Sequence, residues 1–134
     1  SPAINVIMAQ RLVRTLCEKC KKGIGASVDE KKIILKHLEK IPATYKAYVP
    51  QKISVWRAIG CEFCNMTGFK GRIGIFEAFL VDDEIERLII TNPPQAKLQA
   101  TAINQGMLTM YQDGILKVIS GITSFEELNR VVSG

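Results

Sequence analysis

Two cysteine pairs of identical spacing constrain the fold of this 134-residue chain more than any other feature. The first pair is Cys17 and Cys20, the second is Cys61 and Cys64, and together they are all the cysteines of the sequence. Two residues between cysteines allow one tight turn to direct both sulfur atoms at a single point. Two such turns brought together form a tetrahedral four-sulfur site, the geometry that structural zinc prefers. We therefore expect one zinc ion bound by four thiolates.

Two other uses of paired cysteines fit the sequence less well. Disulfides require an oxidising compartment, and the sequence shows no secretory signal. A thioredoxin-like redox site uses one Cys-x-x-Cys pair after a strand, which leaves a second pair unexplained. Residues 21–60 separate the pairs, a longer gap than in a compact zinc ribbon. We expect this segment to carry structure of its own, with the metal holding its two ends.

The charge of the chain changes sign along its length. Residues 1–72 contain 14 lysines and arginines against 5 acidic residues, whereas residues 73–134 contain 4 against 8. The change falls shortly after the second cysteine pair and indicates two subregions rather than one uniformly basic surface. No apolar run approaches the roughly 20 residues that a membrane-spanning helix needs.

Residues that would support catalysis are scarce. Neither GxxxxGK[ST] nor GxGxxG occurs, and the single histidine, His37, lies among lysines in a helical pattern. A solvent-facing position is the simplest interpretation of this histidine. We therefore do not expect a free-standing enzyme.

A helix is predicted between the cysteine pairs. Ser27 and Glu30 have capping-box spacing, and apolar residues at i, i+4 and i+7 predict a helix over about 28–40, which ends before a proline. Residues 22–25 contain two glycines and are interpreted as a flexible turn. Residues 42–51, bracketed by prolines, are interpreted as a loop.

Two stretches around the second cysteine pair are rich in β-branched and aromatic residues. Residues 53–58 are predicted to form a strand that leads to Cys61, and residues 73–80 a second strand. The simplest sheet pairs these two strands with each other, antiparallel. Residues 3–16 are also apolar, but their periodicity does not decide between a helix end and an extended segment.

The remainder of the chain is predicted to be helical. Capping patterns begin at Asp83, Thr109 and Ser124, and a further helix is expected over about 95–105. Gly114, inside one of these helices, predicts a kink or a close approach of another element. The loops are short, so consecutive helices should pack together. The expected fold is α+β: a small zinc-held subdomain with a helix and an antiparallel two- or three-stranded sheet, followed by an all-helical subdomain.

The order of these features resembles the C-terminal part of the bacterial secretion ATPases that drive type II secretion and type IV pilus assembly. The resemblance lies in residues 9–20, in residues 60–77 with their Gly-Phe-Lys-Gly-Arg turn, and in residues 106–127, which begin Gly-Met-Leu-Thr. The pilus-extension branch is the more similar one. Residues 22–52 show little of the resemblance.

This resemblance implies a cytoplasmic, zinc-containing appendage of a RecA-like hexameric motor. Residues 1–14 would end the ATPase core, residues 15–80 would form the tetracysteine zinc-binding subdomain, and residues 81–134 would form a C-terminal helical subdomain. The phosphate-binding loop and the Walker B carboxylate of the family lie upstream, and neither occurs in this sequence. The chain is therefore expected not to hydrolyse ATP, and ATP and Mg²⁺ are expected only in the full-length protein.

The leading functional hypothesis is a non-catalytic module that couples the motor to the inner-membrane assembly platform. Its expected partners are the rest of the motor and the platform or secretion proteins, which would hold it at the inner membrane. Arg11 and Arg14 are candidates for contact with nucleotide or a neighbouring subunit, although a structural or solvated role is equally open for both.

Two other zinc modules are weighed against this hypothesis. A nucleic-acid-binding module is favoured by the basic first half, but Trp56, Phe63 and Phe69 are not interleaved with a dense basic run as a stacking platform requires. A chaperone-type zinc domain would repeat CxxCxGxG four times, whereas this chain has two cysteine pairs.

Overall fold

The computed structural model describes residues 6–133, which form the expected α+β fold with a helical C-terminal part. In chain order its elements are β1 (Val6–Leu16), β2 (Lys22–Gly25), α1 (Val28–Glu39), the 3₁₀ helix η1 (Ala43–Tyr48), β3 (Ser54–Arg57), the 3₁₀ helix η2 (Glu62–Cys64), β4 (Phe69–Leu80), α2 (Asp83–Ile90), α3 (Gln95–Asn104), α4 (Met110–Ile119) and α5 (Phe125–Val131).

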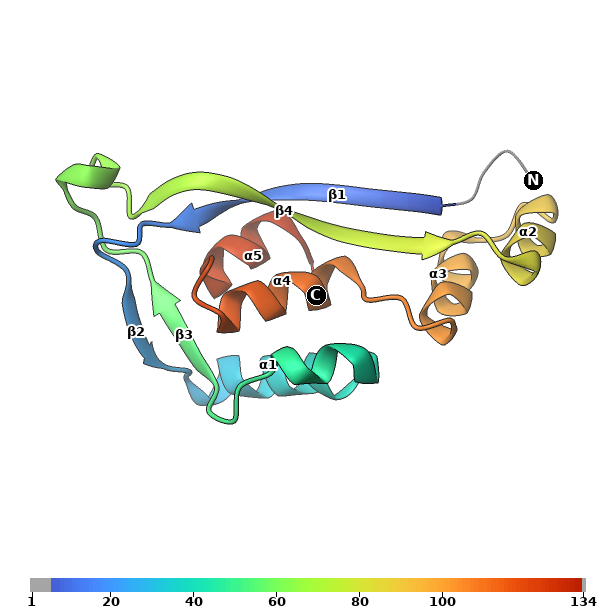
Figure 1. The fold of residues 1–134 in the computed structure, drawn as a ribbon, viewed down its shortest axis with the longest axis horizontal. Helices are drawn as coiled ribbons and strands as arrows, with labels where there is room; N and C mark the ends of the chain where they lie inside the picture. Colours follow the sequence, from blue (N-terminus) through green and yellow to red (C-terminus); the bar gives the residue numbers. More distant parts are fainter. Residues whose placement is uncertain (1–5, 134) are drawn as a thin grey trace.

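A long antiparallel ribbon of β1 and β4 runs along one side of the molecule (Figure 1). Its register pairs Val6 with Leu80 at one end and Leu16 with Phe69 at the other. Of residues 3–16, for which the sequence left helix and extended conformation open, residues 6–16 form a strand. Of the segment 1–14, which was assigned to the end of the motor core, residues 1–5 lie outside the described residues.

The predicted pairing of residues 53–58 with residues 73–80 is wrong. β3 pairs with β2, and β4 pairs with β1. The interpretation of residues 22–25 as a flexible turn is therefore also wrong. Gly23 lies directly opposite Trp56, and a Cβ on this glycine would come within 2.9 Å of the indole Nε1. The glycine thus makes room for an aromatic ring across the strand pair, which is a use of glycine that local sequence does not distinguish from a turn.

The predicted helix starts agree closely with the structure. Ser27 and Thr109 each form a reciprocal capping box with the residue three positions later, and the side chain of Ser124 accepts a hydrogen bond at the start of α5. The start of α2 differs by one residue, because Asp82 rather than Asp83 is the capping residue. The predicted loop at 42–51 contains the short helix η1, which follows a proline with its φ already near the helical range.

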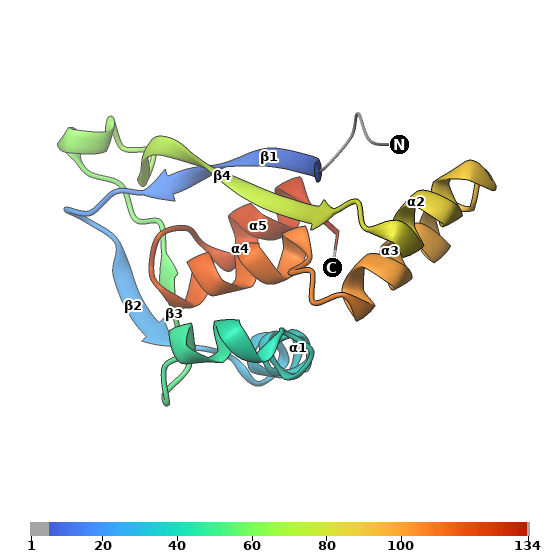
Figure 2. The same cartoon turned by 45° about the vertical axis from the view of Figure 1, so that its right-hand side comes forward.

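Helix α4 lies at the centre of the hydrophobic core, between the ribbon and α1 (Figures 1 and 2). Its fully buried Ile115 shares one core cluster with Val13 of β1, Ile34 of α1 and Ile75 of β4. The core therefore draws side chains from both sides of residue 80. The division of the chain into subdomains at 14 and 80 stays a prediction.

The close approach expected at Gly114 is present. A Cβ on this glycine would come within 2.3 Å of Cδ1 of Leu128, a fully buried residue of α5. Helices α4 and α5 are consecutive and pack on each other, as do α2 and α3.

Helices α2 and α3 form a hairpin at the end of the ribbon where β4 finishes (Figures 1 and 2). The loop between them contains Asn92, which adopts a left-handed conformation with φ of 52°. Within residues 6–133, no helix is long and apolar enough to cross a membrane.

Candidate metal centre

The four cysteine sulfur atoms gather where the ribbon meets the small β2–β3 sheet. Cys17 and Cys20 follow β1, whereas Cys61 and Cys64 lie in the turn between β3 and β4. All four Sγ atoms lie within 4.8 Å of one another. The Sγ–Sγ distance is 3.9 Å for Cys17 and Cys61 and 3.8 Å for Cys20 and Cys64.

These distances fit a tetrahedral metal site. A tetrahedron with metal–sulfur bonds of about 2.3 Å places its sulfur atoms about 3.8 Å apart. A disulfide needs an S–S distance of about 2.05 Å, and all four cysteines are free. Soft thiolate donors in tetrahedral geometry suit zinc better than magnesium or calcium. The donor set therefore fits the ion that the cysteine spacing predicts.

The backbone around the second cysteine pair is shaped to direct both sulfurs inward. Gly60 has a φ of 114°, and a Cβ there would come within 2.8 Å of the carbonyl oxygen of Met66. Met66 itself is left-handed and donates its N–H to the carbonyl of Cys61 at 2.7 Å. The glycine that the sequence placed just before Cys61 is thus required by the turn.

Backbone amides also donate hydrogen bonds to the sulfur atoms. The N–H of Gly60 lies 3.3 Å from Sγ of Cys20, and the N–H groups of Cys61 and Gly68 each lie 3.2 Å from Sγ of Cys64. Such donors stabilise negative charge on sulfur and orient the ligands of a metal. Sequence spacing alone did not identify Gly68 as part of the site.

The thiols of the cluster do not ionise equally. Burial acts to raise the pKa of Cys64, but the hydrogen bonds from Cys61 and Gly68 outweigh it and lower that pKa to about 6. At Cys20 the N–H of Gly60 acts to lower the pKa, but burial and the neighbouring thiols raise it to about 11. One thiolate disfavours the next in so small a space. A divalent cation would supply the positive charge that lets all four ionise.

Arg14 lies in an ion pair, on the ribbon side of α5. Its guanidinium donates to both carboxylate oxygens of Glu127, at 3.1 and 2.9 Å, and its backbone N–H donates to the same carboxylate at 2.8 Å. The guanidinium also lies 4.1 Å from the ring centroid of Phe69. Arg11 donates to the backbone carbonyl of Val131 at 3.1 Å. Both arginines thus tie β1 to the C-terminal helix, and a contact with nucleotide or a neighbouring subunit stays a prediction for each.

Glu127 is a buried carboxylate three residues after Ser124, the residue at which a capping pattern was predicted to begin. Its side chain is fully buried, and Arg130 also pairs with it at 2.8 Å. Burial acts to raise its pKa, but the hydrogen bonds from Arg130 and Arg14 outweigh burial and lower the pKa to about 2. Nothing in the local sequence signals that this glutamate faces the core.

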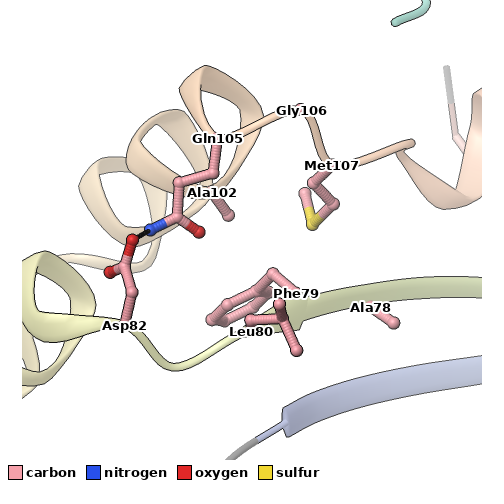
Figure 3. A pocket seen from close by; sticks show the side chains of 8 residues that line it. All are labelled: Ala78, Phe79, Leu80, Asp82, Ala102, Gln105, Gly106 and Met107. Carbon is pink, nitrogen blue, oxygen red and sulfur yellow. Dashed lines mark hydrogen bonds between the residues drawn. The ribbon is translucent and has the colours of Figure 1, made fainter. Parts of the chain in front are cut away.

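A shallow cavity of about 340 Å³ lies at the other end of the ribbon (Figure 3). Its polar side chains, Asp82 and Gln105, are hydrogen-bonded to each other. Gln105 donates this bond, and the other carboxylate oxygen of Asp82 accepts from the N–H of Ile85 at the start of α2. Its lining is Ala78, Phe79, Leu80, Asp82, Ala102, Gln105, Gly106 and Met107.

The fold and the site define a small α+β module in which four cysteines could hold a metal ion. Residues 1–130 match the model of a protein family described as type II/IV secretion system protein. The chain belongs to this family.

Known relatives come from both pilus assembly and type II secretion. The chain is 32% identical over 131 residues to the type IV pilus assembly ATPase PilB of Acinetobacter baylyi, covering 98% of this chain and 21% of that protein. It is 35% identical over 128 residues to PilB of Thermus thermophilus, covering 96% of this chain and 13% of that protein. It is 35% identical over 125 residues to the type II secretion system ATPase E of Vibrio cholerae, covering 93% of this chain and 22% of that protein. The chain thus spans a quarter or less of the length of these relatives.

Proposed function

We propose that this chain is a non-catalytic C-terminal module of a hexameric secretion or pilus-assembly ATPase. In this proposal one zinc ion at Cys17, Cys20, Cys61 and Cys64 organises the module, which couples the motor to the inner-membrane assembly platform from the cytoplasmic side. The observation that carries it is the tetrahedral spacing of four sulfurs contributed by two distant segments. Membership of the secretion family supports the motor context.

The role proposed for zinc is structural. Four cysteine ligands complete a tetrahedral site and leave no open position for substrate or water, as is usual for structural zinc. The ion would join the segment after β1 to the segment before β4. It would thereby fix the end of the ribbon at which the two strands separate.

The ribbon supports a coupling role because one of its faces is apolar and uncovered. Val6, Met8 and Leu12 lie on one face of β1, with the polar Gln10 between Met8 and Leu12. They share this face with Leu80, the cross-strand partner of Val6. All four side chains are exposed. Several exposed apolar side chains on one face are typical of a contact with another protein surface. We propose that this face packs on the remainder of the motor.

The aromatic residues considered for base stacking under the nucleic-acid-binding alternative are mostly covered in the fold. Trp56 packs against Gly23 and Gly121, and Phe69 lies beneath Arg14. Of the three aromatic residues considered, Phe63 alone is exposed. One exposed ring does not form a platform for successive bases.

The proposed function is tested by separating nucleotide binding from transport. Phosphoryl transfer needs a phosphate-binding loop and Mg²⁺ ligands, which the sequence lacks, so the chain alone should show no ATP turnover above blank. In the full-length motor, Cys61→Ser should reduce transport or pilus assembly while nucleotide still binds. Glu62→Gln, an exposed change in the same turn, is the control and should be silent. Loss of nucleotide affinity in a folded Cys61→Ser hexamer would contradict a purely structural and coupling role.

A further inference from the structure

Helix α1 has one face in the core and one face in solvent. Ile34 and Leu38 are buried, and the helix packs on α4. The ring of His37 lies 4.6 Å from that of Tyr111, and this histidine is half-buried. The sequence had indicated a solvent-facing position instead. The opposite face of α1 is on the side of the molecule remote from the ribbon (Figure 1).

The solvent face of α1 carries a row of lysines. Lys32, Lys36 and Lys40 are spaced four residues apart, so they share one side of the helix, and all three are exposed. Among residues 6–133, none of the three forms an ion pair. We term the exposed lysines of α1 and its C-terminal end the basic face; they are Lys31, Lys32, Lys36 and Lys40. They outnumber the exposed acidic residues of the helix, Asp29 and Glu39, which lie seven residues from Lys36 and Lys32 and thus on the same side.

Apolar side chains lie beside the lysine row. Val28 is 82% exposed, and Leu35, seven residues later on the same side of the helix, is also exposed. Tyr48, at the end of η1, is exposed as well. A helix with lysines on its outer face and uncovered apolar residues beside them is typical of segments that lie in a membrane interface.

The rest of the molecule favours one orientation at a charged surface. The first turn of α2 and its cap are acidic, with Asp82, Asp83, Glu84 and Glu86 in succession around Ile85. Helix α2 lies at the far end of the molecule from the β2–β3 sheet and away from α1 (Figure 2). An anionic surface would therefore attract the basic face and repel α2.

We propose that the basic face of α1 docks on anionic phospholipid headgroups, with Val28 and Leu35 entering the headgroup layer. Lysines attract anionic lipids at short range, and apolar contacts add to that attraction. The contact would place the ribbon on the side of the module away from the bilayer. This proposal rests on burial and charge and requires neither the zinc site nor the platform, so it can fail while the proposed function stands.

Vesicle co-sedimentation of the purified chain tests the proposal. Vesicles of phosphatidylcholine with phosphatidylglycerol should bind the chain, and vesicles of phosphatidylcholine alone should not. The double variant Lys32→Glu with Lys36→Glu should weaken binding about 30-fold or more, since each lysine near the surface contributes roughly 1 kcal/mol. Raised salt should weaken binding by the wild type.

A matched control reverses two exposed charges elsewhere. Arg87→Glu with Lys97→Glu makes the same change in net charge on α2 and α3 and should leave vesicle binding close to that of the wild type. Circular dichroism confirms that both variants keep their helices. Leu35→Ser should weaken binding without altering its salt dependence, because this change removes an apolar contact and no charge.

Three outcomes would overturn the proposal. The first is that vesicles with phosphatidylglycerol bind the chain no better than neutral vesicles, including no binding at all. Equal loss of binding in both double variants would show that net charge, rather than the basic face, is responsible. Duplex DNA binding that α1 variants abolish, in the absence of vesicle binding, would assign the face to nucleic acid instead.

Discussion

The turns around the cysteines and the core around α4 are held together by different forces. In the core, Ile115 and Val118 are fully buried in a cluster of apolar side chains that includes residues from five other elements. In the second cysteine turn and its flank, Ile59, Phe63 and Met66 are 57%, 44% and 68% exposed. Apolar burial therefore stabilises the core, whereas it contributes little to the cysteine turns.

This difference explains how a small module can combine two kinds of stability. The core has helix caps, buried isoleucines and a buried glutamate that pairs with two arginines, each of which forms without a ligand. The cysteine turns have left-handed residues at Asn65 and Met66 and hydrogen bonds to sulfur, which hold a shape that four thiolates favour only around a cation. We infer that the two regions respond differently to the same perturbations.

The largest effect is expected from loss of one sulfur ligand. Cys61→Ser should abolish metal binding and with it the ordering of residues 60–68, because structural zinc contributes about 10–16 kcal/mol in zinc-finger peptides. Hydrogen exchange should show loss of protection in the cysteine turns and retained protection in α4. Met66→Ala, an exposed change in the same turn, is the control. Loss of both regions in one transition would show that the core also depends on the metal.

A smaller effect is expected at the ion pairs of the buried Glu127. Glu127→Ala leaves Arg14 and Arg130 without their shared carboxylate, but both arginines are about half exposed to solvent. The free energy of unfolding should therefore fall by about 2 kcal/mol. Urea unfolding measures this change. Zinc content should be unaffected, since Glu127 belongs to the core. A variant that loses zinc along with stability would contradict the separation of the two regions.

The same carboxylate predicts an acid dependence of stability. The pKa of Glu127 is lowered from 4.5 to about 2 in the folded state, so its stabilising contribution is present above about pH 4.5 and is lost as pH falls towards 2. Its arginine partners are 45% and 60% exposed, so screening limits the contribution to about 2 kcal/mol. Glu127→Gln should flatten the slope of stability against pH in that window. An unchanged slope would assign the acid sensitivity to other groups.

The smallest effect is expected where α4 crosses α5. Gly114→Ala improves helix propensity by about 1 kcal/mol but forces the buried Leu128 to move, at an overpacking cost of about 1–3 kcal/mol. We expect a net loss of about 1 kcal/mol in urea unfolding. Gly25→Ala, with no atom within 4 Å of the added Cβ, should be close to neutral. Equal effects at both sites would contradict the close packing of α4 on α5.

Local signals predicted the features that depend on few neighbours. Cysteine spacing identified the residues that gather their sulfurs, and the capping residues Ser27, Thr109 and Ser124 gave helix starts that agree with the structure. Strand pairing depends on long-range partners instead. The sequence predicted a turn at Gly23, because no residue near it in the sequence indicates that it accommodates the indole of Trp56.

The sequence also did not predict which charged residues are buried. Glu127 follows Ser124 at capping distance, which explains its position without indicating that Arg14, from the other end of the chain, meets it. Likewise, the amide of Gly68 joins the cysteine cluster through a turn whose shape depends on left-handed residues. Contacts between segments far apart in the sequence therefore account for most of what sequence analysis missed.

The metal content of the freshly purified chain tests the central claim most directly. Elemental analysis of protein prepared without chelators should give one zinc per chain, and X-ray absorption at the zinc edge should show four sulfur neighbours at about 2.3 Å. The Cys61→Ser variant should lose this signal, and Met66→Ala should keep it. Absence of zinc from folded protein whose four thiols are reduced, with the cysteine turns still protected from hydrogen exchange, would contradict a metal-organised module.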